Sequence, residues 1–94
     1  MKITIIYGPE GSGKTIMAHG LHAMLNHQAR STGRPPGTII DCIPGPFGRR
    51  QMKKALAGVR RRPSLSHLIL VTNEKPESAV LEQADFLVET KVAR

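Results

Sequence analysis

Continuous apolar runs and spaced apolar stripes alternate along the chain, and together they predict strands separated by helices. The first strand is expected at Lys2–Tyr7, where most residues are β-branched or otherwise apolar. Three similar runs lie at Thr38–Ile43, Ser66–Thr72 and Asp85–Thr90. Runs of this length and composition are typical of strands in a parallel sheet that is covered on both faces.

Between these runs, the apolar residues follow helical spacing. A helix is predicted over Thr15–Ala29, with one stripe that consists of Met17, Leu21, Met24 and Gln28, widened by Leu25 and Ala18. Gly20 lies in the middle of this helix, and we expect it where the helix approaches the sheet closely. A second helix is predicted from about Arg49 to Arg62, and it would bury Met52, Ala55, Leu56 and Val59. A short third helix follows Pro76.

This alternation predicts an α/β fold: a three-layer αβα sandwich around a small, mostly parallel four-stranded sheet. The chain has 94 residues, which is enough for one domain over 1–94 and leaves no room for a second. In folds of this kind, ligands bind at the carboxyl ends of the strands. The loops that follow the strands are therefore the first places to search for chemistry.

The loop after the first strand reads Y-G-P-E-G-S-G-K-T over Tyr7–Thr15 and fills the pattern G-x-x-x-x-G-K-[ST]. This pattern, also called Walker A, describes a phosphate-binding loop between a strand and a helix. Its glycines allow positive φ angles, so that backbone N–H groups converge on phosphate oxygens, and the helix end adds its positive dipole. The residues predicted to bind nucleotide are Gly8, Pro9, Glu10, Gly11, Ser12, Gly13, Lys14, Thr15 and Ile16.

Two side chains of this loop have predicted roles toward ATP and Mg²⁺, the expected ligands. Lys14 is expected to reach the β- and γ-phosphates, and the Thr15 hydroxyl is expected to complete the shell of a bridging Mg²⁺. GTP is disfavoured, because the guanine-reading pattern N-K-x-D is absent and the segment from Asn73 to Pro76 matches it only superficially.

The loop resembles that of the P-loop NTPase superfamily, and the order of elements resembles a reduced version of its branch of recombinase-like and AAA-type ATPases. In that branch, one strand ends in an Asp that holds Mg²⁺ through water, and a neighbouring strand ends in a polar γ-phosphate sensor. The resemblance implies these roles for Asp41, which ends T-I-I-D, and for Asn73, with Thr72 as a less favoured sensor. Lys14, Asp41 and Asn73 would then be catalytic, and Thr15 and Asp41 would be metal ligands.

The same resemblance implies the sheet order fourth, first, third and second strand, because the usual extra strand and helix before the Asp-bearing strand are missing. One departure concerns hydrolysis. Many ATPases of this branch carry a Glu directly after the Asp, and here that position is Cys42. We therefore expect slow hydrolysis unless another base serves, for which Glu10 and Glu74 are the nearby candidates, although each is more typical of a solvated charge.

The formal charge of +7 is concentrated in the middle of the chain. Between Arg30 and Arg62 there are nine basic residues and one acid, whereas acids predominate after Pro63. The basic helix at Arg49–Arg62 predicts contact with nucleic acid or another polyanion, and a solubilising helix face is the alternative. Because aromatic residues are not interleaved with the cations, such contact would be directed to the backbone and sensitive to salt. An arginine finger could come from Arg49, Arg50 or the cluster Arg60–Arg62.

The histidines, the cysteine and the start of the chain bear on metal binding and on the cellular compartment. His19 and His22 are three residues apart, but His27 lies on another face of the helix, so a metal site is not expected. We expect His19 and His22 to be a pair that is at the surface or partly packed. The single cysteine, Cys42, excludes an internal disulfide and fits a reducing compartment. The start of the chain lacks a signal-peptide pattern, and no apolar run approaches about 20 residues, so we expect a cytoplasmic protein without membrane contact.

Two other functions stay open at this point. The loop also resembles that of thymidylate-kinase-type nucleotide kinases, although the chain has no room for an acceptor site and lid. A non-catalytic nucleotide-binding module of a larger assembly is the other alternative, because four short strands leave two sheet edges for a second copy or another subunit.

Overall fold

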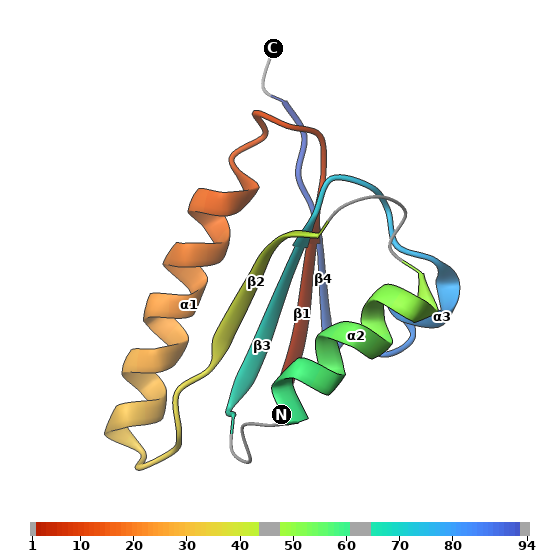
Figure 1. Cartoon of the computed structure of the whole chain (residues 1–94). Helices are drawn as coiled ribbons and strands as arrows, with labels where there is room; N and C mark the ends of the chain where they lie inside the picture. Colours follow the sequence, from red (N-terminus) through yellow and green to blue (C-terminus); the bar gives the residue numbers. More distant parts are fainter. Residues whose placement is uncertain (1, 44–47, 61–64, 93–94) are drawn as a thin grey trace.

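The computed structural model describes residues 2–43, 48–60 and 65–92, with only the backbone described for 41–43, 59 and 60 (Figure 1). Its elements are β1 (Lys2–Tyr7), α1 (Lys14–Ser31), β2 (Thr38–Ile43), α2 (Arg49–Arg60), β3 (His67–Thr72), α3 (Ser78–Leu81) and β4 (Phe86–Glu89). Their types and order confirm the α/β pattern predicted from the apolar residues. Within the described ranges, no helix is both long and apolar enough to cross a membrane.

The four strands form one sheet in the order β2-β3-β1-β4, and every neighbouring pair is parallel. This confirms the predicted order. β1 pairs with β3 up to Tyr7 opposite Thr72, and with β4 up to Tyr7 opposite Glu89. Because the strands are parallel, their carboxyl ends share one edge of the sheet, which is the upper edge in Figure 1. The loop after β1 therefore lies between the ends of β3 and β4.

β2 departs from regular pairing where its candidate acid lies. Ile40 is opposite Leu70 and Ile43 is opposite Thr72, so three steps along β2 match two along β3. A register shift of this kind accommodates one extra residue, as a β-bulge does. β2 has the predicted bounds, Thr38–Ile43, so Asp41 lies within the strand and is not its last residue. Asp41 therefore lies two residues before Ile43, the residue of β2 that is level with Thr72.

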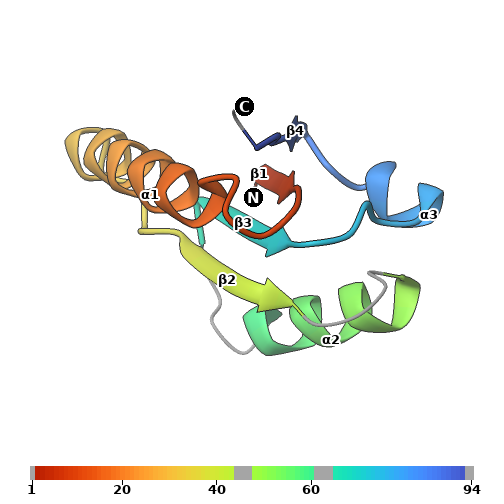
Figure 2. The ribbon, with the colours of Figure 1, turned by 90° about the horizontal axis from the view of Figure 1, so that it is seen from above.

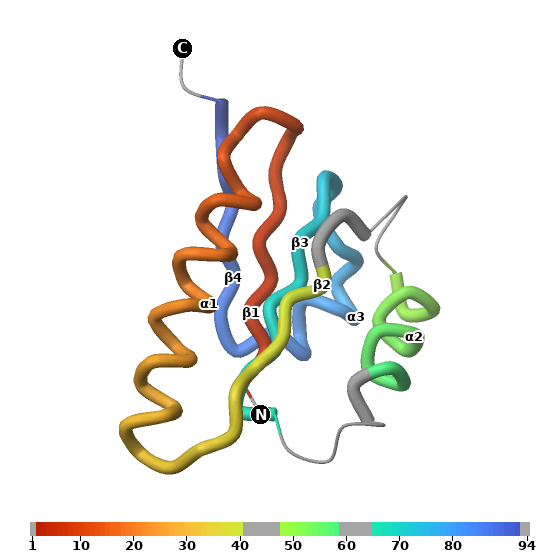
Figure 3. The backbone as a smooth tube through the Cα atoms, turned by 60° about the vertical axis from the view of Figure 1, so that its left-hand side comes forward, coloured from red at the N-terminus to blue at the C-terminus, as the bar shows by residue number. Residues whose placement is uncertain are grey.

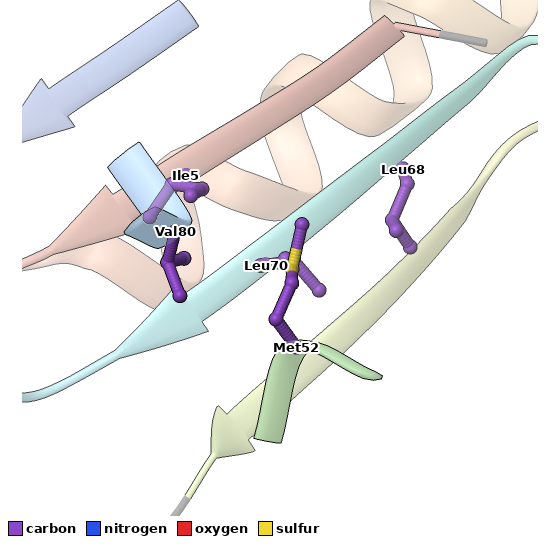
Figure 4. Close-up of a cluster of buried hydrophobic side chains, with 5 residues drawn as sticks. All are labelled: Ile5, Met52, Leu68, Leu70 and Val80. Carbon is purple, nitrogen blue, oxygen red and sulfur yellow. The ribbon is translucent and has the colours of Figure 1, made fainter. Parts of the chain in front are cut away.

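Helices cover both faces of the sheet, with α1 on one side and α2 and α3 on the other (Figure 2). Successive side chains of a strand point to opposite faces, so each strand contributes to both apolar clusters. The cluster under α2 and α3 contains Ile5, Met52, Leu68, Leu70 and Val80 (Figure 4). The cluster under α1 contains Ile6, Ala18, Ile69 and Val71. The three-layer αβα arrangement is thus present.

The predicted buried face of α1 is confirmed for Ala18, Leu21 and Leu25 and is wrong for the other members of the stripe. Met17 and Met24 are 45% and 53% exposed, and Gln28 is also exposed. The residues turned toward the sheet are Ala18, Leu21, Leu25 and Ala29. The polar residues His22 and Asn26 share this inward side, which is rotated by about one position from the predicted stripe. Gly20 is exposed, with no atom within 4 Å of a Cβ built there, so the expected close approach to the sheet is also wrong.

The predicted buried face of α2 is confirmed where its side chains are described. Met52 is 1% exposed, and Ala55 and Leu56 pack against the same cluster. The side chain of Val59 lies outside the described part of the chain. So do residues 61–64, where the predicted end of this helix fell.

A hydrogen-bonded chain of side chains joins α1 to β3 at the amino end of the sheet. The backbone N–H of Gly37 donates to Oδ1 of Asn26 at 2.9 Å, which orients the amide so that Nδ2 donates to Nε2 of His22 at 3.1 Å. His22 must then donate through Nδ1–H to Nε2 of His67 at 2.9 Å. His67 in turn donates through Nδ1–H to Oγ of Ser66 at 3.0 Å. One backbone donor thereby assigns the direction of every bond in this histidine chain.

Both rings of the histidine chain are therefore neutral, because each has one donor and one acceptor nitrogen already engaged. Burial lowers the pKa of His22, and the nearby His19 lowers it further. Burial also lowers the pKa of His67, with a further contribution from His22. The expected absence of a histidine metal site stays a prediction, although the described residues hold no group of three His, Cys, Asp or Glu that could bind a metal. The structural role of His22 was not foreseen.

The histidine chain predicts a loss of stability in mild acid. Because both folded-state pKa values lie below the ordinary value of 6.5, the folded protein binds fewer protons than the unfolded chain. Stability is then fully present above about pH 6.5 and falls as the pH is lowered through 6.5 toward the folded pKa values, by at most about 1.4 kcal/mol per pH unit for each histidine.

Urea unfolding measured between about pH 7.5 and 5 checks this prediction. His22→Gln should flatten the pH profile, whereas His27→Gln, at an exposed position of the same helix, should leave it unchanged. Equal pH profiles for the wild type and both variants would contradict the assignment.

Candidate functional site

The loop between β1 and α1 adopts the backbone conformation that its glycines predict. Gly11 and Gly13 have φ angles of 76° and 79°, in the left-handed region that disfavours residues with a Cβ. Gly13 is the N-cap of α1 and provides no side-chain cap for it. The first bond recorded at the start of α1 runs from the N–H of Met17 to the carbonyl of Gly13, at 3.0 Å. The first-turn N–H groups of Lys14, Thr15 and Ile16 are therefore available to a ligand.

A hollow of about 320 Å³ lies at this helix end. It is lined by Gly11, Gly13, Lys14, Thr15 and Ile16. The first turn of α1 carries no acidic residue, so the positive end of the helix dipole faces the hollow without an opposing charge of its own. An arrangement of free N–H groups at a helix N-terminus is suited to binding an anion such as phosphate.

Lys14 adds a positive charge at the edge of this hollow. Its side chain is 8% exposed, and Nζ donates to the carbonyl of Pro9 at 3.2 Å. The same carbonyl accepts from Oγ of Ser12 at 2.7 Å and from the backbone N–H of Ser12 at 3.3 Å. The loop is thus curled around the carbonyl of Pro9, and these bonds hold the ammonium group against the loop that lines the hollow.

The ends of β3 and β4 fix the start of the loop from both sides. The N–H of Gly8 donates to the carbonyl of Thr72 at 3.2 Å, and the N–H of Thr90 donates to the carbonyl of Tyr7 at 2.8 Å. The hydroxyls of Thr90 and Ser12 share a hydrogen bond of 2.6 Å, so the end of β4 also holds the middle of the loop. Thr90 is only 6% exposed.

Thr90 is a site residue that the sequence reading missed. Its strand was predicted correctly, and the available signal was a polar residue at the carboxyl end of a strand, where ligands bind in parallel sheets. The motif also predicted that the loop glycines leave no Cβ in the way of a ligand, but it did not indicate which atoms of the protein a Cβ at position 8 would meet. A Cβ on Gly8 would lie 2.6 Å from the carbonyl oxygen of Thr90, 3.2 Å from Oγ of Ser12, and against the Thr90 hydroxyl. The first glycine of the motif is thus required by packing.

The residues with roles implied by the family resemblance lie along the same edge of the sheet. Asn73 is exposed and follows Thr72, which is opposite the last residue of β1, so Asn73 is level with the start of the loop. Thr72 is buried, and its Oγ1 accepts from the N–H of Glu74 at 3.4 Å. Asp41 lies in β2, which β3 separates from β1, and its side chain lies outside the described part of the chain. The catalytic roles of Asp41 and Asn73 stay predictions.

The other candidate groups are placed only in part. Glu10 and Glu74 are exposed, and Arg49 and Arg50 are exposed at the start of α2. The side chain of Cys42 and the cluster Arg60–Arg62 fall outside the described side chains. Neither the base nor the arginine finger is therefore identified.

A larger hollow of about 630 Å³ lies between α1 and the β1–β4 side of the sheet. Its walls include Leu21, Leu25, Phe86 and Val88, and they are mainly apolar. It exists because α1 is the one described helix on this face and leaves β4 partly uncovered, with Phe86 60% exposed. The cations Lys2 and Arg34 also line it, but it lies beside the carboxyl end of α1, where the helix dipole is negative and disfavours a phosphate. The smaller hollow at the glycine loop is therefore the better candidate for nucleotide.

A pair of glycine substitutions tests how the loop is held. Gly8→Ala should lower the free energy of unfolding by about 1–3 kcal/mol or more, because the new methyl group meets the backbone of Thr90. Gly20→Ala, in open space within α1, should raise it by about 0.5–1 kcal/mol. Urea unfolding of both variants provides the measurement, and similar effects of the same sign would contradict the packing at Gly8.

Comparisons of the chain with protein-family models, with curated proteins and with solved structures find no match. The interpretation of the site depends on the motif between Gly8 and Thr15 and on the geometry of the loop that carries it.

Proposed function

We propose that this protein binds Mg²⁺-ATP through the loop from Gly8 to Ile16. The observation that carries the proposal is the start of α1, where a left-handed, uncapped Gly13 leads directly into Lys14 and Thr15. A helix end with free N–H groups, a neighbouring ammonium group and no acid in its first turn favours the phosphates of a nucleotide. The match to G-x-x-x-x-G-K-[ST] selects a nucleoside triphosphate among phosphate ligands.

In this proposal, each part of the loop has a distinct role. The backbone N–H groups between Gly11 and Ile16 cradle phosphate oxygens, and Lys14 exchanges its bond to Pro9 for the β- and γ-phosphates. The bond at 3.2 Å is at the long end of the usual range, so this exchange gives up little.

Mg²⁺ fits the residue types that are available on this edge of the sheet. The Thr15 hydroxyl lines the hollow and would hold the ion, and Asp41 would do so through water, as the family resemblance implies. When bound, Mg²⁺ neutralises charge on the β- and γ-phosphates.

Hydrolysis is proposed to be slow. Cys42 occupies the position where related ATPases carry a Glu that orients water, and a thiol offers a poor substitute for a carboxylate base. We expect phosphate release well below about 1 s⁻¹, the lower end of typical enzyme turnover. Asn73 is the proposed sensor of the γ-phosphate, since it lies level with the loop. Acceptor-dependent production of ADP from ATP and a nucleoside monophosphate would instead identify a kinase.

Replacing Lys14 tests nucleotide binding. Lys14→Ala should weaken Mg²⁺-ATP binding at least tenfold, equivalent to about 1.4 kcal/mol, because it removes the charge at the hollow. Lys2→Ala is a matched control, since Lys2 is an exposed lysine at the opposite end of β1. Titration calorimetry with and without Mg²⁺ measures the ATP affinity of both variants. Equal affinity of Lys14→Ala and Lys2→Ala, with both variants folded, would refute the proposal.

Replacing Thr90 tests whether β4 positions the loop. Thr90→Val keeps the shape but removes the hydroxyl that bonds Ser12, so ATP affinity should fall about two- to tenfold, the usual net effect of one hydrogen bond. Thr32→Val is the control, because that hydroxyl bonds only carbonyls at the far end of α1. Unchanged ATP affinity in Thr90→Val would show that the loop does not depend on this contact.

A further inference from the structure

The exposed face of α2 carries an unbalanced positive charge. The helix reads R-R-Q-M-K-K-A-L-A-G-V-R, with five cations and no acid in twelve residues. Arg49, Arg50, Lys53 and Lys54 are all exposed. Met52, Ala55 and Leu56 face the sheet on the other side of the helix. Packing against the sheet thus determines that the cations point outward; we call these four residues the α2 cationic face.

This charge arrangement is unfavourable for the isolated fold. Arg49 and Lys53, and likewise Arg50 and Lys54, are like charges four residues apart on a helix, where they repel each other. Arg49 and Arg50 also occupy the first turn, at the positive end of the helix dipole. A feature that costs stability and contributes nothing to packing is more typical of a binding surface than of a structural element.

The acidic side chains described nearby leave most of this charge uncompensated. The carboxylate of Glu77 lies against Gly48, about 3 Å from where a Cβ would be, and so sits beside the start of α2. Glu74 and Glu82 are exposed before and after α3, which lies on the same face of the sheet as α2. Asp85 and Glu89 are exposed before and on β4, at the opposite edge of the sheet from β2. Figure 2 shows α2 lying toward the β2 side and β4 at the other end of the sheet. Asp85 and Glu89 therefore lie toward the edge of the sheet that is opposite to the α2 cationic face.

The chemistry of the face indicates which polyanion it fits. Among the described side chains, the large apolar ones that are exposed are Ile16, Met17, Met24, Phe86, Leu87 and Val92, and none of these belongs to α2. A membrane-surface helix needs an exposed apolar face to insert, and a protein interface usually has apolar or aromatic anchors. A nucleic acid needs only cations placed to meet successive phosphates.

We propose that the α2 cationic face binds the phosphate backbone of a nucleic acid without reading its sequence. The bound phosphates would relieve the repulsion within the helix, so binding is favoured by the same charges that destabilise the free protein. This site is separate from the glycine loop, because none of its residues lines the hollow there. The two proposals can therefore fail independently.

The test measures binding of the full chain to a short fluorescent single-stranded DNA, and to its duplex, by anisotropy over a range of salt concentrations. For about four phosphate contacts, the logarithm of the association constant should fall with the logarithm of salt concentration with a slope of about −3 to −4. Replacement of Arg49, Arg50, Lys53 and Lys54 by Gln should weaken binding at least tenfold and bring the slope toward zero. It should also shift the urea midpoint upward.

A charge-matched control replaces Lys2, Arg30, Arg34 and Lys91 by Gln, since these cations are exposed elsewhere. This control should retain most of the DNA binding. The variant Arg49→Lys/Arg50→Lys preserves the charge of the face and should also retain most of it; this variant serves as a further test if the fourfold variant fails to fold. Lys14→Ala should bind DNA normally even if it no longer binds ATP. The proposal is overturned if the wild type binds neither the single-stranded DNA nor the duplex. It is also overturned if the charge-matched control loses as much DNA affinity as the fourfold variant of α2. Binding only to phosphatidylserine vesicles or to polyglutamate also overturns it, in favour of a lipid or a protein partner.

Discussion

The candidate site depends on the close approach of three strand ends at Gly8. β1 lies between β3 and β4, and the N–H of Gly8 donates to the carbonyl of Thr72 on one side. On the other side, Thr90 donates to the carbonyl of Tyr7 and lies so close to Gly8 that no Cβ fits between them. The position of the loop is therefore a property of the whole sheet. Both neighbouring strands must pair in register before the first turn of α1 is correctly placed.

α1 is fixed at both of its ends by polar contacts rather than by a strong apolar stripe. Its N-terminus begins at the glycine loop, and farther along, Asn26 and His22 connect it to Gly37 and His67. The tube in Figure 3 follows this path from the loop at the carboxyl end of the sheet down to the turn that leads into β2. These anchors set the rotation of the helix, with small alanines against the sheet and two methionines left partly in solvent.

α1 and α2 thus attach to the sheet in different ways. α2 packs through Met52, Ala55 and Leu56, which leaves the α2 cationic face in solvent. α1 packs through Ala18, Leu21 and Leu25 and through a hydrogen-bonded chain, and it leaves a mainly apolar hollow beside β4. The proposed ligands follow the same division: phosphates of a nucleotide at the start of α1, and phosphates of a nucleic-acid backbone along α2.

The types and order of the elements, and the strand boundaries to within one residue, were predictable from the amino-acid pattern alone, because continuous β-branched runs, glycine-proline breaks and a local glycine motif are properties of neighbouring residues. The conformation at Gly11 and Gly13 was predictable for the same reason. The buried face of α2 was also predictable, since its apolar residues have no polar competitors on that face. The order of strands in the sheet was predictable only through the family resemblance.

The contacts between residues from distant segments were not predictable and depend on the three-dimensional fold. Thr90 is 78 residues from Ser12, and His67 is 45 residues from His22, so no local pattern connects either pair. The inward face of α1 was partly misjudged because His22 and Asn26 are polar and yet point inward, where partners from β3 and the preceding loop satisfy them. Polar groups are buried only when a partner is present, and where that partner lies in the chain is set by the fold.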